Sequence, residues 1–594
     1  MLPRTPNLPC LRVPPFATDE RVNVDGLDPD AFRPWPETEV AITDPDGTTW
    51  RPVPEGLAAG SEAEARFFTH ETHPLAGREV RDVALDSAGT LWIATDRGVT
   101  LFDRRDGWRT LRGSDGMPIE DVRRILLRPN GERWFATSRG VVRLADGRWS
   151  LFAGRRWLPD DDTVGLAAAR SDTVAVLCRS GATTGIRTST TTLRQKADAI
   201  EAAIRTRHCR LGYVSDCRLV GPGDTSGHSY EASDNDGLWT AVYLAAEAFR
   251  FAITGEHEAR AFAAESLEAL LRLEEVTGIP GFPARAVVGV DEPDVTRSGG
   301  EWHESPCGRW LWKGDTSSDE LNGHYFALPL YYELVADTAE KVRIRQVLRR
   351  ITDHLLEHDF CLSDVDGRPT RWAVFTPQAL NQSANWGLER GLNSLSMLSF
   401  LRVAHAVCGD ERYANALDFL VRRHHYALNT IDQKIMLPGE VNHSDDELSF
   451  LAYYPLFMYE SDPDLLALYR LSMERTARCE LPERNPLWNF MASVALGRPV
   501  GLSDAVATLM EIPTDRARWA VDNRGRTDVA LSWLPERGGN AEGRSVLPYS
   551  ENGMTKWNGN PYELTRGGDG TTEDDGAAYL LPYWLGRFHG LIDD

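Results

Sequence analysis

Clusters of acidic side chains stand immediately before long apolar helical segments in the C-terminal two thirds of this 594-residue chain. The segment GDTSSDELNGHYFALPLYY at 314–332 delivers Asp315, Glu320 and His324 at or just inside a helix start. The segments SDNDG, GEVNHSDDE and TTEDDG precede other apolar runs in the same way. Helix capping explains one or two acids at each start, because the N-terminal end of a helix favours negative charge. Several such starts converging on one mouth predict a carboxylate-lined site.

Paired carboxylates suit the cleavage of a glycosidic bond. One carboxylic acid protonates the leaving oxygen, and a second carboxylate acts as base or nucleophile. We predict Asp236 and Asp315 as this pair, with Glu440 as the replacement candidate. His324 and Tyr325 complete the catalytic candidates, because an elimination next to a carboxylate needs a base and an acid of their kind.

The predicted substrate-binding residues are polar or aromatic side chains at the same helix starts or in nearby loops: Asp234, Trp239, Glu320, Trp386, Arg390, Asn442, His443, Trp488 and Trp557. Flat aromatic rings can stack on sugars, although packing explains each aromatic candidate about as well. Ser444 with Glu447 fits the pattern of a capping box and is interpreted as structural. Thr571 with Asp574 is interpreted in the same way, with Glu573 and Asp575 as solvated acids beside it.

The composition narrows the classes of partner. A formal net charge of −23 argues against nucleic acid and against an anionic membrane surface. Eight cysteines show neither CxxC pairs nor zinc-like spacing, and no HExxH or calcium-binding loop occurs, so we expect free thiols, no metal and no cofactor. The proline-broken N-terminus lacks the apolar core of a signal peptide, so a cytoplasmic location is expected unless an export signal was removed. A homo-oligomer stays open.

An internal repeat lies in the N-terminal third. The segment GTLWIATDRGVTLF at 89–102 returns as GERWFATSRGVVRL at 131–144, and a degenerate third copy ends at Gly181. Alternating apolar residues bounded by Gly and Asp turns, at a spacing near forty residues, predict four-stranded propeller blades. These residues resemble the blades of the two-component-regulator propeller family of periplasmic sensors. We therefore predict an irregular arm over 1–78 with a hairpin near DPDGTTWRPV, and a partial β-propeller over 79–190.

Helical patterns take over from about residue 191, where the strand signals fade. They predict twelve helices in six pairs, with short links within most pairs and long, motif-bearing links between pairs. Six such hairpins closing on themselves give an (α/α)6 toroid over 191–594. The motifs DNDGLWT, KGDTSSDELNGHYF, ERGLNS and GEVNHSDDE resemble those of (α/α)6 carbohydrate-active enzymes, which include glycoside hydrolases and polysaccharide lyases. The predicted fold class is mainly α, with an N-terminal β domain.

The sequence favours a glycoside hydrolase that acts on an oligo- or polysaccharide, because the helix starts offer many carboxylates and few Lys or Arg. A lyase acting on uronic-acid glycans is the first alternative, and it would be expected to bring more positive charge. A sugar isomerase or epimerase is a weaker one, since toroids also host these. A non-catalytic glycan-binding or sensory module remains a further alternative, by analogy with the blades.

Overall fold

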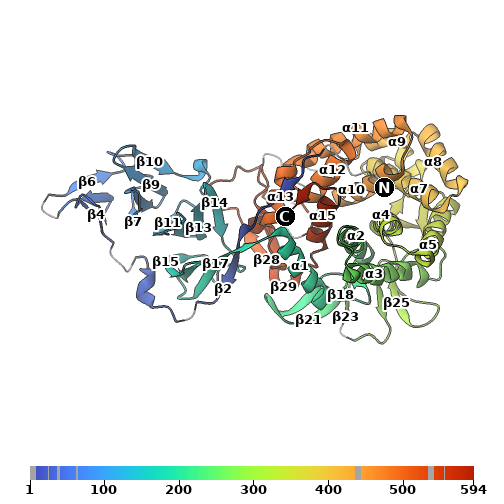
Figure 1. Ribbon diagram of the computed structural model, residues 1–594, viewed down its shortest axis with the longest axis horizontal. Helices are drawn as coiled ribbons and strands as arrows, with labels where there is room; N and C mark the ends of the chain where they lie inside the picture. The colour runs from blue at the N-terminus through green and yellow to red at the C-terminus, as the bar shows by residue number, and fades with distance from the viewer. Residues whose placement is uncertain are drawn as a thin grey trace.

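The structure is a computed structural model that describes residues 8–593 except 25, 37–39, 62–63, 294, 435–442, 444, 533–540 and 554–555. Small β-sheets occupy one end of the molecule and helices the other (Figure 1). The predicted order, an N-terminal β region followed by a helical region, is confirmed. No helix in these described residues is both long and apolar enough to cross a membrane.

The two clear repeats each form one antiparallel four-stranded sheet in which sequential strands are neighbours. The strands of the first are β7 Val80–Leu85, β8 Leu91–Thr95, β9 Gly98–Asp103 and β10 Gly107–Leu111. Those of the second are β11 Val122–Leu127, β12 Arg133–Thr137, β13 Gly140–Ala145 and β14 Arg148–Phe152. The two sheets pack through β7 and β11, which bury Val83 and Val122.

The third, degenerate copy also forms a complete sheet, because a distant segment supplies its fourth strand. Strands β15 Thr163–Arg170, β16 Thr173–Cys178 and β17 Thr183–Thr191 are joined by β2 Phe16–Val22, which pairs antiparallel with β17. This pairing covers the exposed edge that a three-stranded blade would present.

A further four-stranded sheet occupies part of the segment expected to be an irregular arm: β3 Ile42–Thr43, β4 Thr49–Val53, β5 Gly56–Ala59 and β6 Arg66–Thr69. Only its β3–β4 hairpin is expected from the sequence. The missed signal is the turn DPDGTTW, which matches DSAGTLW 42 residues later. In both turns the aspartate accepts a hydrogen bond of 3.0 Å from the indole of the tryptophan, Asp44 from Trp50 and Asp86 from Trp92. The β region therefore holds four such sheets among the described residues.

The helical region is a double ring. The six inner helices are α2 Asp236–Thr254, α4 Ser318–Leu334, α7 Arg390–Cys408, α10 Asp446–Tyr459, α12 Pro486–Leu496 and α15 Ala577–Phe588. The six outer helices are α1 Leu193–Ala203, α3 His257–Glu275, α5 Thr338–Glu357, α8 Glu411–His424, α11 Pro463–Glu480 and α13 Leu502–Glu511. Each inner helix contacts the next, and α15 contacts both α2 and the first outer helix, α1, so the ring closes.

Burial explains which helices are inner. Helix α10 is buried at every residue from Asp446 to Met458, whereas α5 buries one face. Left-handed glycines at Gly255 and Gly409 end α2 and α7, and outer helices begin two residues later. All six inner helices are followed by an outer partner or by the chain end, so they run in one direction and their starts share one end of the ring.

Strands continue beyond residue 191, where the sequence suggests that they fade. A five-stranded sheet runs in the order β23 Val295–Arg297, β21 Asp224–Ala232, β20 Cys217–Gly221, β29 Thr565–Glu573 and β28 Ala517–Asp522. A three-stranded sheet, β22 Val287–Gly289, β25 Trp310–Lys313 and β24 Trp302–Glu304, forms in the insertion after α3. The remaining elements are β18 Cys209–Arg210, β19 Tyr213–Val214, β26 Cys361–Ser363, β27 Pro369–Val374, α6 Pro377–Gln382, α9 Tyr426–Asn429 and α14 Tyr549–Asn552.

The β region is fastened to the helical region at several points. The backbone of Thr527 donates to the Pro118 carbonyl at 2.8 Å, and the Leu151 amide donates to the Glu551 carboxylate at 3.0 Å. Near the chain ends, β1 Leu11–Arg12 pairs in parallel with β30 Ile592–Asp593. The N-terminal segment therefore contacts the helical ring before it reaches the sheets.

Candidate active site

The starts of the inner helices approach one another and define the candidate site, which we call the mouth. The Asn235 amide before α2 donates to Asp319 of α4 at 3.4 Å. Lys556 lies 3.9 Å from the centre of the Trp239 ring on α2 and pairs with Asp575, before α15, at 2.7 Å. Residues separated by more than 300 positions in the sequence are thus brought together, as the acid-rich helix starts predict.

Glu447 is the most unusual acid of the mouth. It lies in the first turn of α10, is fully buried, and neither of its carboxylate oxygens has a hydrogen-bond partner among the described residues. Burial raises its pKa to about 8, and the negative charges of Asp319 and Asp575 add to this effect against the opposing charge of Lys556. A carboxyl group in this state is protonated at neutral pH and is able to donate a proton.

Glu320 and Asp319, both in the first turn of α4, form the neighbouring part of the site. Burial raises the pKa of Glu320 to about 8, although Arg285 acts in the opposite direction. The N-cap Ser317 holds Glu320 at 2.9 Å and Asp319 at 2.5 Å through its hydroxyl group. Asp319 is only half-buried, and its charge raises the pKa of both Glu320 and Glu447. It therefore lies within electrostatic reach of both.

Asp236 and Asp234 differ sharply in environment. Asp236 is fully buried at the start of α2, and one of its oxygens accepts hydrogen bonds from the Ser233 amide at 2.8 Å and the Ser233 hydroxyl at 2.6 Å. Its other oxygen has no hydrogen-bond partner within the described part of the chain but lies 3.9 Å from the Arg210 guanidinium, and burial raises the pKa of Asp236. The Asp234 side chain is 63% exposed and pairs with Lys313. Asp236 does not cap α2, because the N-cap is Asn235 and the Asp236 carboxylate binds Ser233 ahead of the helix; a role in chemistry remains compatible with these contacts.

A second network closes the α15 side of the mouth. Lys556 is buried between Asp216 and Asp575, 2.7 Å from each carboxylate. Burial opposes the ionisation of Asp575, but Lys556 outweighs it and lowers the pKa of Asp575. Burial raises the pKa of Asp216 to about 6. Arg518 contacts Asp574 at 2.6 Å, so every cation here is already paired with an acid.

A third group surrounds the start of α10 on the side of α11. Lys434 pairs with Asp446 at 2.6 Å and with Glu480 at 3.1 Å, and His443 contacts Glu483 at 3.1 Å. Burial and the charge of Glu480 raise the pKa of Asp446 and of Glu483. The predicted binding residue His443 is therefore buried in an ion-pair network. Two other predicted residues, Glu440 and Asn442, lie outside the described residues.

The remaining catalytic candidates are engaged in contacts with other parts of the protein. Both ring nitrogens of His324 contact backbone carbonyl groups, that of Glu320 at 2.6 Å and that of Leu270 at 3.2 Å. Tyr325 is buried, with its hydroxyl 2.7 Å from that of Thr352 on the outer helix α5. The carboxylate of Asp315 accepts from the Arg371 amide at 3.0 Å in the β26–β27 hairpin. These contacts favour structural roles for all three residues.

The aromatic candidates pack mainly against protein. Trp488 stacks on Phe450 with ring centres 4.6 Å apart and meets the edge of Trp557 at 5.6 Å, and both tryptophans are buried. Trp386 is half-buried ahead of α7, where the exposed Arg390 donates to the Leu380 carbonyl at 2.7 Å. The half-buried Trp386 keeps part of its surface open to a ligand.

Several residues important in the mouth are missed by the sequence analysis. Glu447 is interpreted there as half of a capping box, but α10 begins at Asp446 with Asp445 as its N-cap, so Glu447 stands one position too early for that role. The Thr571–Asp574 pair does not cap α15, because that helix begins only at Ala577; Asp575 instead accepts from the Ala577 amide at 2.7 Å, and both aspartates are buried. The available signal was the number of acids at these starts, which exceeds what capping requires.

No family model and no curated protein matches this sequence. Among solved structures, a sugar epimerase from a ruminal bacterium aligns at 12% identity over 66% of this chain and 98% of its own, with a TM-score of 0.37. Cellobiose 2-epimerase from Spirochaeta thermophila aligns at 13% identity over 67% and 97%, also with a TM-score of 0.37. The extracellular domain of a hybrid two-component system from B. thetaiotaomicron aligns at 19% identity over 25% of this chain, with a TM-score of 0.23.

The chain spans only 23% of the length of that extracellular-domain structure. None of these identities or TM-scores is high enough to transfer a function to this chain.

Proposed function

We propose that the helical ring is an (α/α)6 toroid and that its mouth cleaves glycosidic bonds in an oligo- or polysaccharide, with Glu447 as the proton donor. The observation that carries this proposal is the setting of Glu447, which is fully buried at the start of an inner helix with no hydrogen-bond partner among the described residues, a setting that raises its pKa to about 8. Protonation of a leaving glycosidic oxygen requires an acid of this kind.

Asp319 is the proposed partner carboxylate. It is half-buried, and the Ser317 hydroxyl and the Asn235 amide hold its two oxygens. Its charge acts on the pKa of Glu447, as expected for two carboxyl groups that share one site. Lys556 and Asp575 complete the local charge balance. Glu320 is the second candidate acid, because it too is buried with a pKa near 8.

This proposal changes the predicted acid/base pair. Asp236 stays a candidate because one of its oxygens accepts no hydrogen bond among the described residues and has only the Arg210 guanidinium, 3.9 Å away, as a partner. Asp315 is not carried forward, since its carboxylate accepts from the Arg371 amide of the β26–β27 hairpin. Elimination by His324 and Tyr325 is disfavoured, because both side chains are engaged in the core. Acidic side chains already pair with Lys556, Arg518 and Arg285, which leaves little positive charge to bind the carboxylate of a uronic acid.

The test is a panel of neutral and acidic oligo- and polysaccharides, assayed for new reducing ends, for ultraviolet absorbance and for changed stereochemistry by chromatography. We expect new reducing ends without absorbance, lost by at least about 10²-fold in Glu447→Gln. Glu411→Gln, which alters an 82% exposed acid in the first turn of the outer helix α8, should keep full activity.

Three results would overturn the proposal. Absorbance from a new double bond would replace hydrolysis with elimination. A changed sugar configuration without new reducing ends would replace it with isomerisation. Unchanged turnover in Glu447→Gln would remove Glu447 from the chemistry.

A further inference from the structure

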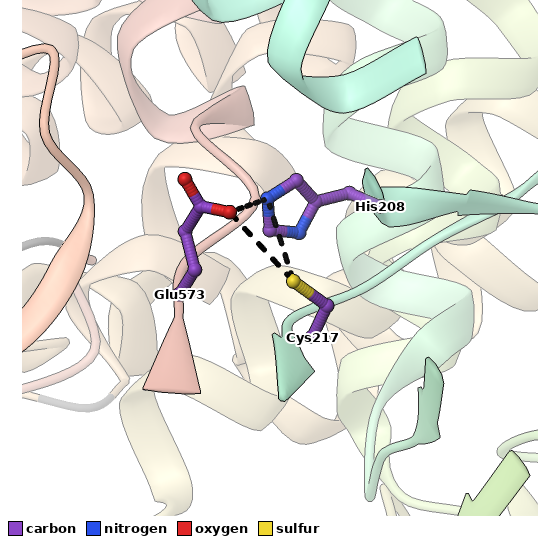
Figure 2. A group of neighbouring side chains, drawn as sticks. All are labelled: His208, Cys217 and Glu573. Atoms are coloured by element: carbon purple, nitrogen blue, oxygen red, sulfur yellow. Dashed lines mark hydrogen bonds and ion pairs between the residues drawn. The ribbon is translucent and has the colours of Figure 1, made fainter. Parts of the chain in front are cut away.

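A buried cluster of three potential metal ligands lies directly behind the mouth (Figure 2). His208 ends the π-helix Ile204–His208 that follows α1, Cys217 begins β20 and Glu573 ends β29. Strands β20 and β29 are antiparallel, with Cys217 directly opposite Glu573. All three side chains are almost completely buried. The sequence spacing hides this cluster, because Glu573 is more than 350 positions from the other two.

The separations of the three ligand atoms are close to those of a tetrahedral zinc site. His208 Nε2 is 3.2 Å from Glu573 Oε2, which is 3.7 Å from Cys217 Sγ, and Sγ is 4.0 Å from Nε2. Bonds of about 2.0–2.3 Å in tetrahedral geometry place ligand atoms about 3.3–3.7 Å apart. We propose that His208, Cys217 and Glu573 bind one zinc-like divalent ion. Movements of a few tenths of an ångström would bring the three ligand atoms to these tetrahedral separations.

The surroundings prepare two of the three ligands. His208 Nδ1 is 3.0 Å from the Ser215 carbonyl oxygen, so Nδ1 carries the hydrogen and the Nε2 lone pair faces the cluster. Glu573 presents a single oxygen, Oε2, both to His208 Nε2 and to Cys217 Sγ.

The thiol must lose a proton when the ion binds. The Cys217 thiol lies 3.7 Å from Glu573 Oε2, and a cysteine that binds zinc does so as the thiolate. Binding forms the metal–sulfur bond and releases that proton to solvent, and affinity should therefore rise with pH. A thiolate, a carboxylate and a neutral imidazole suit zinc, and water would take the fourth position.

Arg207 is the strongest argument against an ion here. It donates to Glu573 Oε2 at 2.6 Å and to Oε1 at 2.8 Å, and it already balances the carboxylate charge. A carboxylate has about four lone-pair positions, however, so Oε2 can accept from Arg207 and still face the ion. A second cluster of potential ligands, His443, Asp446 and Glu483, likewise has a cationic side chain against it, because the Lys434 ammonium group contacts Asp446 at 2.6 Å.

The ion would stabilise the mouth that the proposed function uses. Cys217 directly follows Asp216, and Glu573 directly precedes Asp574 and Asp575. A bound ion would clamp β20 to β29 at the ends that carry these three acids. The metal measurement itself does not depend on any glycan activity, so the two proposals can fail separately.

The test uses the full-length protein without a metal-binding tag, equilibrated with micromolar zinc and then dialysed. We expect about one zinc per chain by elemental analysis in the wild type, and little in Cys217→Ser or His208→Asn. Cys361→Ser, which alters another buried cysteine in β26, is the matched control and should keep its zinc. Circular dichroism checks that each variant is folded.

Cobalt substitution gives a second readout on the wild type alone. Cobalt bound through Cys217 should produce a thiolate-to-metal charge-transfer absorption, together with visible bands of tetrahedral coordination. Absence of stoichiometric zinc and of this absorption in the wild type would overturn the proposal and leave an Arg207–Glu573–His208 ion-pair network. Equal zinc content in Cys217→Ser and the wild type would overturn it as well.

Discussion

Replacing Glu447 by glutamine should stabilise the protein at high pH while it removes the proposed proton donor. The folded state holds Glu447 protonated up to a pKa of about 8, whereas an unfolded chain ionises it near 4.5. Between these values the folded state binds more protons than the unfolded state, so wild-type stability falls as pH rises. Glutamine fills the same space and cannot ionise, so the variant lacks this dependence.

The size of the effect follows from the pKa difference. About 3.5 units at about 1.36 kcal/mol each give an upper limit of about 5 kcal/mol at pH 8. At pH 8 we expect the variant to be more stable than the wild type by about 3 kcal/mol, because the buried glutamine amide loses its contact with water without finding partners. At pH 4 the carboxyl group is mostly protonated in both states, so only the cost of the buried amide remains and the variant should be about 2 kcal/mol less stable than the wild type.

Urea unfolding followed by tryptophan fluorescence at pH 4.5, 6.5 and 8 measures this difference. The transition of a chain with two structural regions need not be two-state, so midpoints are compared with those of Glu411→Gln, whose side chain is exposed. A pH-independent difference, or a variant less stable than the wild type at pH 8, would refute the inference that burial keeps Glu447 protonated.

Three other changes probe the surrounding contacts. Lys556→Met leaves Asp216 and Asp575 without their shared cation, so the pKa of Asp575 should rise. The acid limb of the pH–rate profile for glycan hydrolysis should then move to higher pH, and an unmoved limb would contradict this. Arg285→Ala removes hydrogen bonds to the Asp234 carbonyl and the Asn235 amide oxygen. The thermal melting midpoint should fall by the equivalent of about 2–4 kcal/mol, and an unchanged midpoint would contradict this prediction. Asp44→Ala removes the hydrogen bond to Trp50 and should lower the stability of this sheet by about 1 kcal/mol. Proteolysis within residues 42–69 should then be faster than in the wild type, and equal cleavage rates would contradict this.

The helical ring is predictable because its signals are local. Twelve predicted helices correspond to the six inner and six outer helices, and short links such as Gly255 and Gly409 identify the pairs. Apolar residues on every side mark α10 as an inner helix, and a one-sided pattern marks α5 as an outer one. Such features depend on residues a few positions apart, which a sequence displays directly.

The β region is less predictable because one of its sheets is completed by a distant segment. Nothing near residues 183–191 indicates that β17 pairs with residues 16–22. The sheet containing Trp50 was missed for another reason, since prolines at positions 45, 52 and 54 mask a turn that repeats 42 residues later. Its aspartate–tryptophan hydrogen bond shows that the DxxGTxW turn was the usable signal.

The site is only partly predictable from the sequence. Acidic helix starts identify the segments, but depth of burial decides which acid has the unusual state. Asp315 and Glu320 lie five positions apart, yet one binds a surface hairpin and the other is buried against Arg285. Glu447 was assigned to a cap because the spacing allowed it, and only the start of α10 at Asp446 removes that role.

Two opposing effects act on every acid at these helix starts, and their sizes decide the outcome. The positive end of a helix stabilises a carboxylate by about 0.3–1 kcal/mol, and by about 2 kcal/mol in favourable geometry, which is less than two pKa units. Full burial disfavours the charged form by about 3–5 units. Burial therefore prevails at Glu320 and Glu447, whose pKa values both rise to about 8. At Asp575 the buried ammonium group of Lys556, 2.7 Å away, reverses the balance and lowers the pKa. The same fold feature thus yields a raised pKa at Glu320, whose cation Arg285 is 4.0 Å away, and a lowered pKa at Asp575, whose cation Lys556 is 2.7 Å away.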